Sequence, residues 1–363
     1  MKEYFALLGV LLASLSLAAQ KPQTALYTVG SATASPGEKA TGVIPVPAGT
    51  DLGSNIPVVV FQGRQTGPVL AIAAGAHGTE YASIIAAEQL ISVINPEELA
   101  GTVILLPLIN LNSFEQKVPH VNPTDGKNMN RMYPGSLNGT QTDRVSYFIT
   151  SQVVERCDYF IDMHGGDLDE SLRPYSYWSK SGNEKQDSIS RDMLLAFGLD
   201  HIIIVTDRPR DPQQSRYLET TASTRGKPSI TVEAGSAGTT DSDDVTALVA
   251  GSLNVMRYLK MLPHPPERVQ NPVWLDSQIA VLAEQTGIFY PLVKKGTYAQ
   301  KGMKLGYITD YFGKTIFEAR APISGVVLFI SAVPSMKKGD SIASMAAPAP
   351  DPRLGQPEKT NAP

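Results

Sequence analysis

Two short histidine-containing segments hold the residues best suited to chemistry in this chain. His77 and Glu80 belong to AGAHGTE, and His164 ends the segment FIDMH. Both segments follow apolar runs typical of buried strands, and both histidines are followed by glycine. Two imidazoles and one carboxylate can hold a catalytic zinc ion and leave its fourth position open. The sequence therefore predicts one Zn²⁺ per chain, bound by His77, Glu80 and His164.

The spacing of these residues makes the prediction more specific. Only two residues separate His77 from Glu80, so both side chains can turn towards one point where a strand ends and a helix begins. Gly75 and Gly78 permit the tight backbone that this requires. H-x-x-E alone is a common pattern, but its combination with a later strand-ending Asp-x-His is rare. Asp162 is a candidate for orienting a ligand imidazole.

The surrounding elements indicate how these residues are positioned. From about residue 56, strand-like and helix-like runs alternate, which predicts an α/β fold with a mostly parallel, mixed sheet flanked by helices. Such sheets bind ligands beyond the carboxyl ends of their strands. Glu233 ends a third strand, so we expect it at the same edge as the metal ligands. The expected strands are 58–61, 69–74, 103–109, 159–163, 202–205 and 229–232, and the expected helices are 81–94, 142–156, 188–197, 216–225 and 243–262.

Composition shifts divide the chain into six segments. Residues 1–19 resemble a secretory signal, with an apolar core too short to span a membrane comfortably; a retained anchor is the alternative. A strand-rich segment, 20–55, precedes the zinc hydrolase domain, 56–262. A proline-rich linker, 263–275, leads to a small all-β domain, 276–346, similar to barrel-sandwich modules of the lipoyl type. Residues 347–363 are expected to form a disordered tail. We therefore expect an exported protein, periplasmic or secreted, without a membrane segment in its mature form.

Charge and cysteine content exclude other classes of protein. The formal net charge is −4, whereas a nucleic-acid-binding domain usually shows a basic stripe, so no nucleic acid is expected as a partner. Cys157 is the only cysteine, which rules out an internal disulfide, and we expect it to be buried as a small apolar residue. His120, His201 and His264 lie in a loop, at a strand start and in the linker, so they are poorer metal ligands.

As a set, these motifs resemble the succinylglutamate desuccinylase/aspartoacylase family within the zinc carboxypeptidase-like group. The resemblance covers about residues 56–262 and is weaker to about 346. It implies that His77, Glu80 and His164 bind zinc and that Glu233 is the general base. It is carried by AGAHGTE, DGKNMNRMYPG, IDMHGG and TVEAG.

The same resemblance implies a set of substrate contacts. Asn130 and Arg131 match the Asn-Arg pair that grips the substrate carboxylate, and a guanidinium suits a carboxylate because it binds it bidentately. Tyr290 is similar to a tyrosine that the C-terminal domain contributes to the pocket. The chain lacks the family's arginine before the Asn-Arg pair, which polarises the scissile carbonyl, so His120, Lys127 or zinc alone would take that role. The positions of Arg216, Tyr217 and Arg225 match family contacts less well.

Taken together, these features predict a zinc-dependent hydrolase that cleaves an amide bond near a carboxylate. We favour an N-acyl amino acid deacylase. An exported metallocarboxypeptidase acting on peptides or cell-wall fragments is one alternative, and a non-catalytic binding protein on a hydrolase fold is another. The expected partner is a small molecule or peptide with a free carboxylate. The sequence leaves open whether the chain forms an oligomer.

Overall fold

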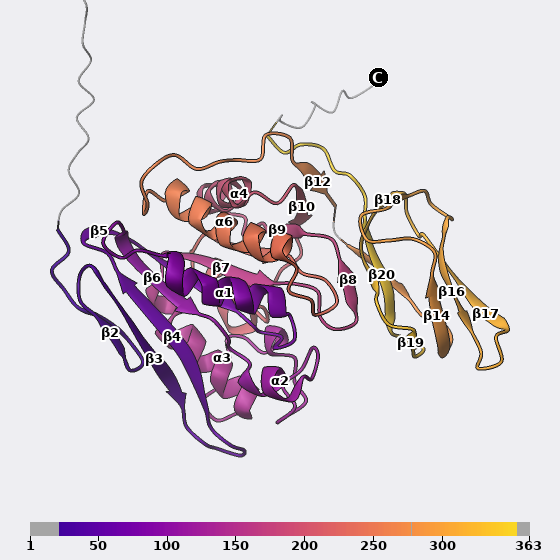
Figure 1. Ribbon diagram of the computed structural model, residues 1–363, viewed down its shortest axis with the longest axis horizontal. Helices are drawn as coiled ribbons and strands as arrows, with labels where there is room; N and C mark the ends of the chain where they lie inside the picture. Colours follow the sequence, from indigo (N-terminus) through magenta and orange to yellow (C-terminus); the bar gives the residue numbers. More distant parts are fainter. Residues whose placement is uncertain (1–21, 277, 354–363) are drawn as a thin grey trace, which may run out of the picture.

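A nine-stranded mixed sheet with helices on both faces forms the main body of the protein (Figure 1). The computed structural model describes residues 22–276 and 278–353. Five of the eight neighbouring strand pairs are parallel, which confirms the predicted α/β class. In sheet order the strands are β12 (Val273–Leu275), β10 (His201–Val205), β9 (Tyr175–Ser179), β11 (Ser229–Glu233), β7 (Tyr159–His164), β5 (Gln65–Ala74), β6 (Ala100–Leu106), β4 (Ser54–Gln62) and β3 (Glu38–Val46).

The central strands are apolar because both of their faces are covered. All seven residues of β6 are buried, as are the last five of β7. Parallel strands covered on both faces show continuous apolar runs, and every expected strand falls on a strand of this sheet. However, β6 ends three residues earlier than expected. Pro107 follows it directly, and proline cannot donate a hydrogen bond to the sheet.

Helices cover the two faces of the sheet and create two hydrophobic cores. On one face pack α1 (Tyr81–Val93), α4 (Glu184–Phe197) and α6 (Ser242–Tyr258). On the other pack α3 (Gln141–Gln152) and α5 (Leu218–Ser223), and Cys157 is buried there as expected. The helix expected at 142–156 is shorter, because α3 gives way to a 3₁₀ turn, η2 (Val154–Arg156). The remaining short helices are α2 (Leu111–Gln116), η1 (Met129–Arg131) and η3 (Pro212–Gln214).

The strand β9 was not expected, and it reverses part of the sheet. It pairs antiparallel with β11 and parallel with β10, while β10 pairs parallel with β12. The carboxyl ends of β10 and β12 therefore lie at the edge opposite to the ends of β5, β7 and β11. This reversal matters for the functional site, because residues after β10 reach it from a different direction.

The C-terminal region forms two antiparallel sheets around a core of its own. One sheet also recruits β8 (Glu170–Leu172), which belongs to the main body and pairs with β18. This pairing joins the two regions directly after the loop that follows His164. The strands are β13 (Ile279–Leu282), β14 (Gly287–Pro291), β15 (Tyr298–Ala299), β16 (Lys304–Thr309), β17 (Thr315–Arg320), β18 (Gly325–Ser331), β19 (Ser335–Met336) and β20 (Ser341–Ala346).

Three expected segments continue the main fold rather than standing apart from it. Within 20–55, β1 (Tyr27–Val29) and β2 (Ala32–Ala34) form a hairpin, and β3 is the edge strand of the large sheet. The expected linker ends in β12, a strand of the same sheet. At the start of the expected tail, the Ala349 backbone N–H donates to Trp274. Backbone hydrogen bonds hold these segments against the main body.

Two of the expected terminal features lie outside the described residues: the signal segment 1–19 and the tail beyond residue 353. Among the helices that are described, none combines the length and apolarity needed to cross a membrane.

Candidate metal centre and substrate cavity

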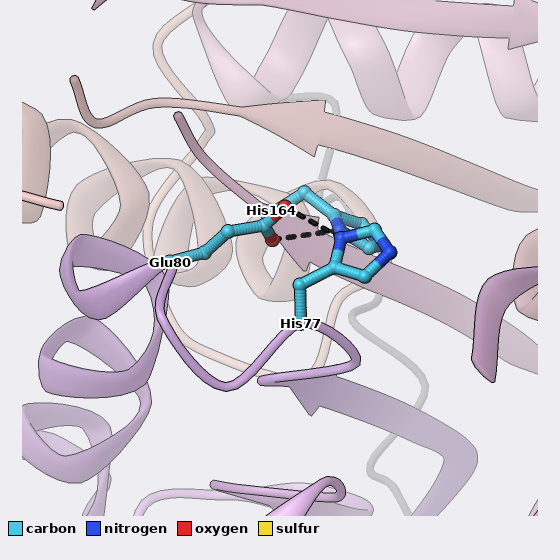
Figure 2. Close-up of side chains that lie close together, drawn as sticks. All are labelled: His77, Glu80 and His164. Carbon is cyan, nitrogen blue, oxygen red and sulfur yellow. Dashed lines mark hydrogen bonds and ion pairs between the residues drawn. The ribbon is translucent and has the colours of Figure 1, made fainter. Parts of the chain in front are cut away.

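The three predicted metal ligands converge at one edge of the sheet, as Figure 2 shows. His77 lies in the turn after β5, Glu80 is the N-cap residue of α1, and His164 is the last residue of β7. One ligand atom from each lies within 4.8 Å of the others. Glycine makes the turn possible: Gly75 has a φ of +70°, and a Cβ on Gly78 would lie 2.2 Å from the backbone nitrogen of Phe114.

The donor atoms of this cluster suit a divalent transition metal. The Nδ1 atoms of His77 and His164 face the two oxygens of Glu80, at 2.6 and 2.8 Å. Burial on its own would raise the pKa of Glu80, but the two histidines outweigh burial and hold that pKa well below its usual range. An ionised, buried carboxylate between two imidazoles is the nitrogen and oxygen set that zinc accepts. His77, Glu80 and His164 therefore form a candidate metal site.

Neighbouring residues hold the far sides of the two imidazole rings. The Nε2 atom of His77 lies 3.1 Å from the side-chain oxygen of Asn128. The Nε2 atom of His164 lies 3.3 Å from Asp162, whose carboxylate is buried. Carboxylates and amides in such positions fix the orientation of a ligand imidazole. The structure thus places Asp162 where it can orient His164.

Glu233 lies beside the metal ligands, in a cavity of about 490 Å³. It ends β11, and its Cα is paired with that of His164 on the neighbouring parallel strand. Burial, only partly offset by the charge of His164, raises the pKa of Glu233 well above its usual range, and Glu80 and Glu170 raise it further. The expectation that His77, Glu80, His164 and Glu233 share one sheet edge is therefore met.

A further carboxylate in the cavity, that of Glu170, was not anticipated. Glu170 begins β8, and its carboxylate accepts a hydrogen bond from the backbone of Asp167 at 3.2 Å. Burial raises the pKa of Glu170 to about 7, and the charge of Glu80 contributes to this. The acid-rich stretch GGDLDE after His164 was the available sequence signal.

Asn130 and Arg131 both line the cavity, but they are placed differently. The amide group of Asn130 contacts Nε2 of His164 at 3.2 Å and accepts from the Leu218 backbone at 2.8 Å, so both its polar atoms are engaged within the protein. Arg131 stacks on Tyr217, with its Cζ 4.7 Å from the ring centroid. Burial lowers the pKa of Arg131, and the nearby cation Arg208 lowers it further. Arg131 is thus the better placed of the two to bind a substrate anion.

Arg208 is a second guanidinium in this cavity and was missed by the sequence analysis. Its Cζ lies 3.8 Å from the centroid of the Tyr217 ring. It follows β10, whose carboxyl end lies at the opposite edge of the sheet, so the rule that located Glu233 could not locate Arg208. The charged stretch TDRPRD was the available signal, but no motif distinguishes it from a surface loop.

Of the two expected replacements for the family's missing arginine, only His120 lies at the cavity. Its Nε2 lies 2.9 Å from Asp169 and its Nδ1 lies 3.3 Å from Asp167. Burial alone would lower the pKa of His120, but the hydrogen bond to Asp169 and the charges of both aspartates raise it to about 9. Lys127 instead forms an ion pair with Asp143 at 2.6 Å and is not among the residues that line the cavity.

The C-terminal region contributes to the cavity, although not through Tyr290. Tyr290 is 41% exposed on β14, stacks on Tyr307 and is not among the cavity-lining residues. Gln278 occupies the wall instead and donates to the Tyr177 hydroxyl at 2.7 Å. The predicted role of Tyr290 therefore has no support in this arrangement. The other lining residues from this region are Ala280, Phe329, Ser341 and Ser344.

Two of the three weaker candidates, Arg216 and Arg225, do not line the cavity. Arg225 forms an ion pair with Glu155 at 2.6 Å, and Arg216 is exposed and does not line the cavity. Tyr217 does line it, between the two guanidiniums of Arg131 and Arg208. His201, a poorer metal candidate by sequence, contacts the Tyr298 hydroxyl at 2.8 Å.

The chain is similar in sequence or in fold to several known proteins. The N-alpha-acetyl-L-2,4-diaminobutyric acid deacetylase of Halomonas elongata is 26% identical over 297 residues, which cover 80% of this chain and 85% of that protein. A succinylglutamate desuccinylase/aspartoacylase from Rhodobacter sphaeroides superposes with a TM-score of 0.77 at 23% identity, covering 86% of this chain and 96% of that one. The product-bound ectoine utilization protein EutE (DoeB) from Ruegeria pomeroyi has a TM-score of 0.78 at 21% identity, covering 90% and 98%.

The match to a protein family is the most informative of these comparisons. Residues 66–259 match the succinylglutamate desuccinylase/aspartoacylase catalytic domain, and this range contains every predicted site residue except Tyr290. The match covers more than half of the chain and includes the His-Glu-His cluster. The chain therefore belongs to the succinylglutamate desuccinylase/aspartoacylase family of amidohydrolases.

Proposed function

We propose that this protein is a zinc-dependent deacylase that hydrolyses the amide bond of a small N-acyl amino acid. The observation that carries the proposal is the position of Glu233, which lies beside the His-Glu-His cluster in a cavity that also contains Arg131. The family membership and the deacetylase from Halomonas elongata support the same reaction class.

His77, Glu80 and His164 would hold the metal ion through two nitrogens and one carboxylate oxygen. When bound, zinc lowers the pKa of a water molecule and polarises a carbonyl group. Asn128 and Asp162 keep the two imidazole rings oriented, because each contacts a ring nitrogen on the side away from Glu80.

Glu233 is placed to move the proton during hydrolysis. Its carboxylate accepts a proton from the attacking water as the new C–O bond forms, and it returns that proton to the amine nitrogen as the C–N bond breaks. Burial raises the pKa of Glu233, which makes its carboxylate a stronger base than an exposed one.

Arg131 is proposed to bind the substrate carboxylate and so orient the amide towards Glu233. In the structure its guanidinium donates to the Asn130 backbone oxygen at 2.7 Å and stacks on Tyr217. A guanidinium fixed on an aromatic ring is pre-organised to bind a planar carboxylate bidentately.

The experiment is metal analysis of purified protein, followed by activity assays of the zinc-loaded form. The panel contains N-acetyl and N-succinyl amino acids, N-acetyl-2,4-diaminobutyrate and dipeptides. We expect about one zinc per chain and release of the free amino acid from N-acyl substrates. Hydrolysis of dipeptides alone would favour the carboxypeptidase alternative. If the zinc-loaded protein turns over no member of the panel, the deacylase proposal is wrong.

We also propose that the protein acts after export, on the basis of residues 1–19. The charged start, the apolar core and the small residues Ala18 and Ala19 support this. N-terminal sequencing of protein from the periplasm or the medium should begin near residue 20. Recovery of the intact N-terminus from the cytosol would contradict it.

A further inference from the structure

A single buried carboxylate, that of Asp167, connects the chain segments that carry the candidate metal ligands. Asp167 is fully buried and follows His164 by three residues. Its Oδ1 accepts hydrogen bonds from the Thr79 hydroxyl and, at 2.7 Å, from the Leu168 backbone N–H. Its Oδ2 accepts from the His120 backbone N–H at 2.8 Å and lies 3.3 Å from Nδ1 of the same residue. Because an ionised carboxylate only accepts hydrogen bonds, it suits a position where every neighbouring group donates.

The contact with Thr79 bears directly on the metal centre. Thr79 is fully buried and lies between the two ligands of the same turn, His77 and Glu80. The Glu80 backbone N–H donates to the His77 carbonyl oxygen at 3.3 Å, which closes this turn. Since Thr79 belongs to the turn, holding its side chain also fixes the directions in which the two ligand side chains leave the backbone.

The contact with His120 holds a second segment against the metal centre. His120 has a φ of +62°, a left-handed backbone conformation that is unfavourable for a residue with a side chain. Asp167 stabilises this conformation, because its carboxylate accepts the backbone N–H of His120. The same loop leads to Asn128, whose side-chain oxygen lies 3.1 Å from Nε2 of His77. Asp167 therefore joins the loop that orients His77 to the turn that carries it.

Asp167 also connects the metal centre to the C-terminal region. The Glu170 backbone N–H donates to the Asp167 carbonyl oxygen at 2.9 Å, and the Asp167 backbone N–H donates to the Glu170 carboxylate at 3.2 Å. Glu170 begins β8, which pairs with β18 and lies between the main body and the C-terminal sheets (Figure 1). Asp167 is thus the point at which the turn 77–80, the loop 117–128 and the segment leading to β8 meet.

We propose that Asp167 is a positioning residue of the metal centre, whose carboxylate holds the turn 77–80 and the loop 117–128 in the arrangement that binds the metal ion. This inference rests on the proposed zinc site, because it names the residue that keeps two of its ligands in place. Asp167 acts through Thr79 and His120 and is not itself one of the three clustered ligands. Groups that support metal ligands in this way raise the affinity for the metal, because the ligands are then held in the binding geometry.

The test measures the dissociation constant for zinc by competition with a chromophoric chelator. Asp167→Asn should raise this constant on the order of 10- to 100-fold, because the new amide group places donors opposite donors. Thr79→Val should also raise it, whereas Thr79→Ser, which keeps the hydroxyl, should stay close to wild type. Asp169→Asn is the matched control. Asp169 contacts the His120 ring at 2.9 Å, and its replacement leaves the bond between Asp167 and Thr79 intact, so the affinity for zinc should not change.

Hydrogen exchange of the metal-free protein provides a readout that needs neither zinc nor turnover. In Asp167→Asn, amide exchange should become faster in residues 77–80 and 118–122 and stay unchanged in α6, which packs on the other side of the sheet from α3. Unchanged affinity for zinc, or unchanged exchange in both segments, would overturn the proposal. Uniformly faster exchange would also overturn it, because Asp167 would then only support the fold.

Two further outcomes are separated by the same measurements. If wild type binds no zinc, the proposed function fails, but faster exchange confined to the two segments still supports the positioning role of Asp167. If Asp167→Asn does not fold, the comparison of Thr79→Val with Thr79→Ser decides the question. Equal affinities for zinc in these two variants would refute the role of the bond to Asp167.

Discussion

The two ends of the substrate cavity differ in how their charges are compensated. At the metal end, both oxygens of Glu80 face histidine nitrogens, and those rings contact Asn128 and Asp162 on their far sides. At the other end, Arg131 and Arg208 stack on one tyrosine without a carboxylate partner among the described residues. Opposite charges held close together fix the ligand side chains of an ion, whereas cations without an ion-pair partner lower the energy of an incoming anion. This difference supports the proposal that hydrolysis takes place at the metal end and that the cations at the other end bind the substrate.

The largest effect is expected at the metal end, from Glu233→Gln. The amide cannot accept the proton of the attacking water, so kcat should fall by about 10²- to 10⁴-fold. Zinc content should stay the same, because Glu233 is not one of the three clustered ligands. Turnover and metal content are measured on the same preparation. Near-wild-type turnover would show that another group acts as the base, and loss of zinc would show that Glu233 belongs to the metal site.

A smaller effect is expected at the cationic end, from Arg131→Ala. Loss of the guanidinium should raise KM for N-acyl amino acids by roughly 10- to 100-fold and leave kcat less affected. The corresponding N-acyl amino acid amides, which lack the α-carboxylate, should show little change. Arg225→Ala is the control, since this arginine pairs with Glu155 outside the cavity. Similar KM increases for acids and amides would refute carboxylate binding by Arg131.

The smallest effect is expected for His120, which lies beside the metal end but is not one of the three clustered ligands. It concerns the stability of the protein rather than its activity. Asp169 and Asp167 raise the pKa of His120 from 6.5 to about 9 despite burial. Because the folded-state pKa is raised, this stabilisation is fully present below about pH 6.5 and is lost as the pH rises through 9. The wild type should therefore lose stability over this range relative to His120→Gln. The effect should be modest, since the side chain is half-exposed and screened by solvent.

Denaturant unfolding between pH 6 and 10, with chelator present to exclude the contribution of metal, tests this expectation. The wild-type and His120→Gln curves should converge as the pH rises. Parallel curves across the whole range would show that His120 does not carry the predicted charge.

The positions of the candidate metal ligands and of Glu233 could be predicted because they obey a local rule. His77, Glu80, His164 and Glu233 each follow or end a strand that is recognisable from its apolar residues, and these strands run in the same direction. The carboxyl ends of parallel strands meet at one edge of a sheet. Arg131 was identified through a motif rather than through geometry.

Tertiary structure alone decided the rest of the cavity. Pairing of β9 antiparallel to β11 reverses β10, so Arg208 enters the site from a strand whose end lies at the other edge. Pairing of β8 with β18 brings the C-terminal region to the cavity through Gln278 rather than Tyr290. The direction of each strand and the strands that it pairs with depend on contacts between residues distant in the sequence. Local residue patterns along the chain do not reveal these contacts. The sequence by itself thus determined which residues meet at the candidate metal centre, and the long-range pairings determined which cations and walls surround it.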